Sequence, residues 1–398
     1  MDPPAATVPP SPADLRAVRG RLLLDGKLVP GAVVFSGATI REVIRGDAIA
    51  RDRLPAQVID AALVTPGLID LQVNGGFGHD LAAGGAALRA LAQRLPATGV
   101  TSFLPTVISG PPERYRTAAD AIEHTGGAAG ATPLGLHLEG PFIAPARAGA
   151  HARAAIAAAD AAILDEACAR GILRLVTLAP ERAGALALIA RLRAGDVVVS
   201  LGHTDASFEE LTAGIDAGAT MVTHLYNAMS PFGHRAPGAV GAALTDARVV
   251  AGLIADGVHA HPAALRLARA AKGPDGIALV TDAVAAAGLG PGRYTLADQA
   301  VISDGAAVRL AADGVTLAGS ALTLDQAVRN FVRFTGAPVE EALHLATEVP
   351  ARLLGPAAAT KGRLAIGADA DLVLWSAALE VERTIIAGTA AFERVAPS

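Results

Sequence analysis

Residues 197–227 (VVVSLGHTDASFEELTAGIDAGATMVTHLYN) contain the pattern that decides the fold. A short apolar run ends at His203, a stretch with helical periodicity follows over Phe208–Ala217, and a second short apolar run ends at His224. Apolar runs of this length, separated by an amphipathic helix, are typical of parallel strands that are buried on both faces. The stretch therefore predicts a strand, a crossover helix and a second, parallel strand.

The same unit repeats along the chain in both directions. We predict strands at Val64–Val73, Val100–Val107, Leu134–Leu138, Leu173–Leu178, Val197–Leu201, Met221–Thr223, Val249–Ile254 and Ile277–Thr281. The predicted helices between them include Ala86–Leu95, Glu181–Arg193, Phe208–Ala217 and Pro262–Lys272. Eight such units predict an α/β fold of the (β/α)8 TIM-barrel class, and a doubly wound open sheet is the alternative.

Both ends of the chain lack this alternation of strands and helices. Val18–Ile44 and Gly362–Phe392 have the pattern of short strands joined by turns, and we expect them to pair into one small sheet domain. Ser320–Leu354 is predicted to be helical. We place a disordered lead-in at residues 1–15, the small domain at 16–63 plus 359–398, and the barrel at 64–358.

Composition excludes several classes of protein. Apolar residues make up 52% of the 398 residues but aromatic residues only 3%, which indicates alanine-rich helices rather than membrane spans. The net charge is −5 and there is no basic run, so neither nucleic acid nor an acidic membrane surface is expected as a partner. The single cysteine, Cys168, is expected to be a buried thiol, and with no signal-peptide pattern we expect a cytoplasmic protein.

Polar side chains follow several predicted strands. Glu139, His203 and His224 each end one strand, and these ends meet at one face of a barrel. One carboxylate and two imidazoles can hold a catalytic divalent metal and leave a position open, although each histidine alone could be structural. Asp282, at the end of the eighth strand, suits a general base, with a helix cap as the alternative. His137 is either a partner of Glu139 or a buried histidine bonded to backbone.

Seven motifs then suggest a family. The chain closely resembles the N-acetylglucosamine-6-phosphate deacetylases of the amidohydrolase superfamily, from about Gly31 to Leu374. The motifs are PGLID (66–70), GLHLEGPF (135–142), LGHTDA (201–206), THLYNAM (223–229), LVTDA (279–283), GSALTL (319–324) and GADADLV (367–373), with a further match around Pro350-Ala351-Arg352. GLHLEGPF and THLYNAM are specific to the family, whereas GADADLV and the match around Arg352 occur across many amidohydrolases.

The resemblance implies both fold and activity. It implies a barrel with a small β-sandwich made from both chain ends, which agrees with the pattern of strands. It also implies hydrolysis of the acetamide of N-acetyl-D-glucosamine 6-phosphate to D-glucosamine 6-phosphate and acetate, a step of amino-sugar catabolism. Within it, Glu139, His203 and His224 match the metal ligands and Asp282 the acid/base residue.

Further residues gain a role only through the resemblance. His151 matches a histidine that polarises the substrate carbonyl, and Arg235 matches an arginine that reaches the phosphate in the neighbouring subunit, which implies at least a homodimer. Substrate contacts are also implied for Ala150, Asn227, Ala228, His259 and Ser320.

The residues at the end of the first predicted strand, Val64–Val73, differ from those of the wider superfamily. Many amidohydrolases carry His-x-His there and bind a second metal, whereas this chain has Gln72-Val73-Asn74. We therefore predict one divalent metal per chain, with Gln72 and Asn74 as hydrogen-bonding groups near the substrate. Zinc is expected, and iron, cobalt and manganese are alternatives.

Two other functions compete with this reading. One is a different amide hydrolase of the superfamily, dihydroorotase-like or aminoacylase-like, which would have no use for Arg235 or for the Asn227-Ala228 pair. The other is a non-catalytic sugar-phosphate-binding protein, which would need no base at Asp282 beside a metal.

Overall fold

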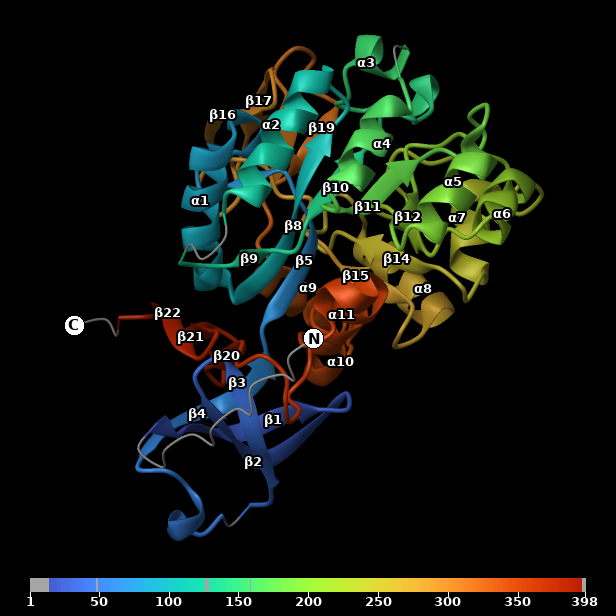
Figure 1. Cartoon of the computed structure of the whole chain (residues 1–398). Coiled ribbons are helices and arrows are strands. Elements are labelled where there is room, and N and C mark those ends of the chain that lie inside the picture. Colours follow the sequence, from blue (N-terminus) through green and yellow to red (C-terminus); the bar gives the residue numbers. More distant parts are fainter. Residues whose placement is uncertain (1–13, 48, 126–128, 158, 396–398) are drawn as a thin grey trace, which may run out of the picture.

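The computed structural model describes residues 14–47, 49–125, 129–157 and 159–395. The predicted barrel is confirmed, because eight parallel strands lie side by side in chain order and the order never reverses, as it would in a doubly wound sheet (Figure 1). The strands are β5 (Leu68–Val73), β8 (Val100–Ile108), β10 (Leu136–Glu139), β11 (Leu173–Leu178), β12 (Val198–Leu201), β13 (Met221–Val222), β14 (Val250–Leu253) and β15 (Ile277–Leu279). The predicted lead-in at residues 1–15 lies outside the described residues except for its last two.

Side chains close the barrel between its first and last strands. Within the described part of the chain, β5 and β15 share no ladder, and one bridge joins Val73 to Ala283. The buried Asp70 carboxylate accepts hydrogen bonds from the backbone N–H of Thr281 and from its hydroxyl, the latter at 2.6 Å. Burial raises the pKa of Asp70 to about 6, and the Thr281 bonds oppose that rise. The carboxylate thus takes the place of strand pairing at this seam.

Helices cover the outside of the barrel. They are α1 (Gly85–Arg94), α2 (Pro112–Glu123), α3 (Arg153–Ala157), α4 (Ala162–Ala169), α5 (Ala185–Ala194), α6 (Phe208–Asp216), α7 (Gly238–Thr245), α8 (Pro262–Lys272), α9 (Leu324–Thr335), α10 (Val339–His344) and α11 (Glu348–Leu354). α6 begins with a capping box between Ser207 and Glu210 and buries Leu211 and Ile215. None of the described helices is long and apolar enough to cross a membrane.

The prediction for Cys168 was wrong. Its side chain is exposed on α4, because that short helix turns Leu164 and Ala167 toward the interior instead.

The small domain built from both chain ends is confirmed. Its strands β1 (Arg16–Leu24), β2 (Lys27–Ser36), β3 (Thr39–Arg45), β4 (Gln57–Pro66), β20 (Leu372–Trp375), β21 (Val381–Ile386) and β22 (Thr389–Glu393) form one sheet at one end of the molecule (Figure 1). The strand predicted as one run over Val64–Val73 is divided at Gly67. A Cβ at Gly67 would lie 1.9 Å from the Thr101 hydroxyl, so only glycine fits at this junction. The domain limits given above stay a prediction.

A four-stranded antiparallel sheet follows the barrel and was missed from the sequence. It consists of β16 (Gly292–Leu296), β17 (Gln299–Ser303), β18 (Ala307–Leu310) and β19 (Leu317–Ser320). It lies beside α2, whose Arg114 pairs with Asp298 in the turn between β16 and β17 (Figure 1). Ser320 therefore ends a strand, and the predicted helical segment begins only at Leu324.

Candidate metal centre and active site

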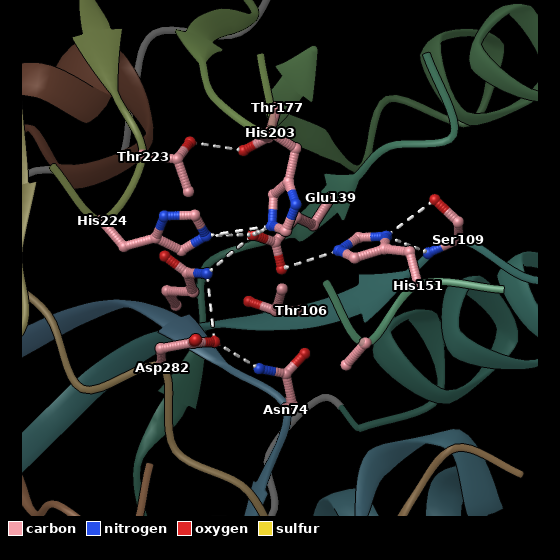
Figure 2. Close-up of polar contacts among 12 residues, drawn as sticks. Asn74, Thr106, Ser109, Glu139, His151, Thr177, His203, Thr223, His224 and Asp282 are labelled. Carbon is pink, nitrogen blue, oxygen red and sulfur yellow. Dashed lines mark hydrogen bonds and ion pairs between the residues drawn. The ribbon is translucent and has the colours of Figure 1, made fainter. Parts of the chain in front are cut away.

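Three side chains from separate strand ends meet inside the barrel mouth. Glu139 Oε1 lies 3.1 Å from His224 Nε2 and 3.3 Å from His203 Nε2, and the two Nε2 atoms are 3.1 Å apart (Figure 2). All three residues are buried. Burial alone would raise the pKa of Glu139, but the hydrogen bonds and charges of His203 and His224 lower it well below its usual value. The site therefore offers a carboxylate and two imidazole nitrogens to one point, which fits a divalent cation.

The hydrogen bond of His203 fixes which nitrogen is free. Its Nδ1 lies 2.7 Å from the Arg147 carbonyl oxygen. A carbonyl can only accept, so Nδ1 carries the proton, and in the neutral ring the lone pair of Nε2 faces the point between Glu139 and His224 where a cation would bind. This arrangement is the usual one for a metal-binding histidine.

His151 has the opposite tautomer. By distance alone it also lies close enough to share a cation with Glu139 and His203. However, its Nδ1 accepts the backbone N–H of Ser109 at 3.1 Å, so Nε2 carries the proton. Burial, followed by the charge of His203, lowers the pKa of His151 to about 3, which keeps the ring neutral. His151 is thus a buried N–H donor facing the cluster, with Nε2 3.9 Å from Glu139 Oε2. Ser109 was not named from the sequence, where only its place after a strand distinguishes it.

Two amides hold Asp282 next to the cluster. Gln72 Nε2 donates to both Glu139 and Asp282 at 3.1 Å. Asn74 Nδ2 donates to Asp282 at 2.8 Å (Figure 2). Burial and the Glu139 charge raise the pKa of Asp282 to about 8, while His224 and Asn74 oppose that rise. A cation in the cluster would also oppose it, because a positive charge favours the carboxylate. N–H donors thus fill the space between the two carboxylates.

Backbone strain is concentrated in the same residues. His203, His224, Ala228 and Asp282 have positive φ angles of 48°, 28°, 50° and 51°. Each costs about 1–3 kcal/mol for a residue with a side chain, and such strain gathers at functional sites. Here it turns the side chains that follow the strands back over the barrel mouth.

A buried hydroxyl layer lies under the cluster, with His137 in its middle. Thr106 Oγ1 lies within hydrogen-bond distance of the Leu104 carbonyl and 3.1 Å from His137 Nδ1. His137 Nε2 lies 2.9 Å from the Thr177 hydroxyl, which in turn lies 2.7 Å from the Thr223 hydroxyl. Burial lowers the pKa of His137 to about 4, in keeping with a neutral ring. His137 is therefore bonded to side chains of neighbouring strands and to the Leu71 backbone, which agrees with the prediction of a buried histidine bonded to backbone rather than a partner of Glu139.

A cavity of about 360 Å³ opens above these groups. Of the residues implied to contact substrate, the cavity is lined by Asn74, Ala150, Asn227, Ala228 and His259. His259 Nδ1 is held at 2.6 Å by the Asp256 carboxylate, which sequence reasoning missed and which leaves Nε2 for a ligand.

Three implied contacts lie elsewhere. Gln72 is not part of the cavity lining and reaches the site only through its bonds to Glu139 and Asp282. The Ser320 hydroxyl donates to the Thr281 carbonyl at 2.6 Å and is fully buried. Arg235 is exposed on a loop that borders a separate hollow with α6.

Comparisons with known proteins agree with this geometry. The Amidohydrolase family model matches residues 63–391. N-acetylglucosamine-6-phosphate deacetylases from Homo sapiens and Bacillus subtilis are 45% and 39% identical to the chain, covering 82% and 83% of it and 82% and 85% of their own lengths. The solved structure of a mutant N-acetyl-D-glucosamine-6-phosphate deacetylase from Mycobacterium smegmatis, in complex with N-acetyl-D-glucosamine-6-phosphate, superposes with a TM-score of 0.88 at 33% identity, covering 95% of this chain and 99% of that one.

Proposed function

Since the chain belongs to the amidohydrolase family and, within it, to the N-acetylglucosamine-6-phosphate deacetylases, we propose that it hydrolyses N-acetyl-D-glucosamine 6-phosphate to D-glucosamine 6-phosphate and acetate. The observation that carries this function is a buried carboxylate, Asp282, held beside the Glu139, His203 and His224 cluster in a cavity open to solvent. A protein that only bound the sugar phosphate would gain nothing from that carboxylate.

The residues present suit amide hydrolysis. Glu139, His203 and His224 would hold one divalent cation, zinc being the expected one, and when bound it would supply Lewis-acid chemistry to the amide carbonyl and to water. His151 Nε2–H donates a hydrogen bond to the carbonyl oxygen as negative charge develops there. Asp282 takes a proton from the attacking water and passes it to the leaving nitrogen. The water oxygen joins the acyl carbon, the C–N bond breaks, and acetate and the amine leave.

We propose that each chain binds one divalent cation rather than two. In His-x-His amidohydrolases, the second metal is bound by lone pairs of residues at the end of the first barrel strand, which is β5 in this chain. Gln72 and Asn74 instead direct their NH2 groups at Asp282, so they donate where a cation would require acceptors.

Acetate release from N-acetylglucosamine 6-phosphate tests the function. We expect steady release that a chelator abolishes and added zinc restores. Ring amides of the dihydroorotase type serve as the comparison substrates. Hydrolysis of those with no acetate release would contradict the proposal.

We also propose that Arg235 serves the phosphate in the site of a second subunit. It is exposed and lies outside the lining of its own cavity, and its planar guanidinium can bind a phosphate with two hydrogen bonds. Arg235→Ala alone should raise KM by roughly 100-fold, with kcat less affected.

Mixing variants tests this placement in trans. In an equal mixture of Arg235→Ala and Asp282→Asn chains, half of the dimers contain both, and one of the two sites in each is intact. At a substrate concentration near the wild-type KM, where Arg235→Ala alone is almost inactive, activity should therefore recover to roughly a quarter of wild type. Neither variant alone, at the same total protein concentration, should show this recovery. A mixture that stays inactive, or an unchanged KM in Arg235→Ala, would exclude the placement.

A further inference from the structure

The extra sheet β16–β19 supplies one wall of the active-site cavity. Leu296, at the end of β16, is 4% exposed and lines the cavity together with Leu317 of β19. Leu296 belongs to the same apolar cluster as Ile108, at the end of β8, and Ala150, in the loop after β10. This side of the cavity is mainly apolar, although Arg147 and Thr316 also belong to its lining, and the floor beneath it is made of carboxylates and imidazoles.

The opposite side of the cavity is polar. Asn227 and His259 line it from the loops after β13 and β14. In the ring of eight strands, β8 and β10 stand opposite β13 and β14. The cavity therefore has an apolar end and a polar end, with the Glu139, His203 and His224 cluster between them.

The apolar wall is clamped to the barrel next to the His151 loop. The tight turn between β16 and β17 carries Asp298, which forms an ion pair with Arg114 of α2. The next residue, Gln299, donates its side-chain N–H to the Ala150 carbonyl. These two bonds connect the turn that follows Leu296 to the barrel, at α2 and at the loop that carries His151.

The orientation of the substrate in the cavity follows from the positions of the apolar end and the polar end. His151 comes from the Ala150 loop, and it donates to the amide carbonyl in the proposed reaction. A sugar phosphate has its hydroxyls and charge on the nitrogen side of that amide, where Asn227 and His259 can bind them. The carbon side then points at the apolar end. We propose that Leu296, backed by Ile108, limits the length of the acyl group that the enzyme removes; this inference rests on the proposed deacetylation.

Acyl-length profiles test the inference. The measurement is kcat/KM for glucosamine 6-phosphate carrying N-formyl, N-acetyl, N-propanoyl or N-butanoyl groups. Leu296→Ala should raise the butanoyl-to-acetyl ratio by roughly 10-fold or more over wild type, because it opens space for added methylenes. Leu296→Phe should act in the opposite direction and raise the formyl-to-acetyl ratio.

Ile302→Ala is the matched control. Ile302 lies on β17 of the same sheet, is 40% exposed and does not line the cavity, so both ratios should stay within about twofold of wild type. Unchanged ratios in folded Leu296→Ala would overturn the inference. If that variant proves unfolded by circular dichroism, an unchanged formyl-to-acetyl ratio in Leu296→Phe overturns it instead. Absence of acetate release by wild type would overturn the deacetylation itself, which is a separate result.

Discussion

Replacing Asp282 with asparagine is expected to lower kcat by roughly 10³-fold, within the range found for general acid–base groups. The substitution keeps the shape of the side chain. The new amide can direct its oxygen at Asn74 and Gln72, which donate to Asp282 Oδ1 in the wild type. What disappears is the group that accepts a proton from water and returns it to the leaving nitrogen. The loss should therefore fall on kcat, while metal content and thermal stability stay close to wild type.

Steady-state acetate release and elemental analysis of the same preparation separate these effects. Asp25→Asn is a matched control, because Asp25 is an exposed residue of the small sheet domain that pairs with Arg45. It should leave kcat and metal content unchanged. Near-wild-type turnover by Asp282→Asn, with the metal retained, would rule out Asp282 as the proton-transfer group.

The barrel was predictable because each of its strands is buried on both faces. Such strands appear as continuous apolar runs, so the run Val197–Leu201 identified β12 to within one residue. The sheet β16–β19 escaped because its first two strands alternate between buried and exposed residues over only five positions each. Tertiary contacts with the barrel, such as the packing of Leu296 on Ile108, stabilise it, and these contacts leave no local signal.

The site was predictable to the extent that its residues lie at the carboxyl ends of the barrel strands. Glu139 is the last residue of β10, and His203, His224 and Asp282 each follow a strand, so all four lie where the carboxyl ends of barrel strands meet. The sequence could not reveal which nitrogen of His151 carries the proton, because that depends on a backbone N–H forty-two residues away, at Ser109.

Gln72 and Asn74 also show that the sequence does not reveal how polar side chains are oriented in the site. Their identity in the sequence predicted hydrogen-bonding groups, but only the structure shows that their amide N–H groups are directed at Glu139 and Asp282. By donating N–H to the two carboxylates, they stabilise negative charge that a second cation would otherwise neutralise.

Wild-type protein is therefore expected to bind one equivalent of divalent metal per chain, and Glu139→Gln is expected to lose it. Glu139 supplies the negative charge among the three proposed ligands and contacts both imidazoles. Glutamine keeps the size of the side chain and an oxygen for the Gln72 N–H, but not the charge. Metal affinity should fall by more than about 100-fold, beyond the effect usual for residues that only support a ligand, and kcat/KM should fall with it.

Elemental analysis after gel filtration, followed by titration with a chelator of known affinity, measures this loss without relying on activity. Glu113→Gln provides the matched control, since Glu113 is an exposed residue of α2 far along the chain from the cluster. Two tightly bound equivalents in the active wild type would contradict the single cation and return Gln72 and Asn74 to the role of ligands. Full metal content in Glu139→Gln would contradict the ligand set itself, because two imidazoles would then suffice to hold the cation.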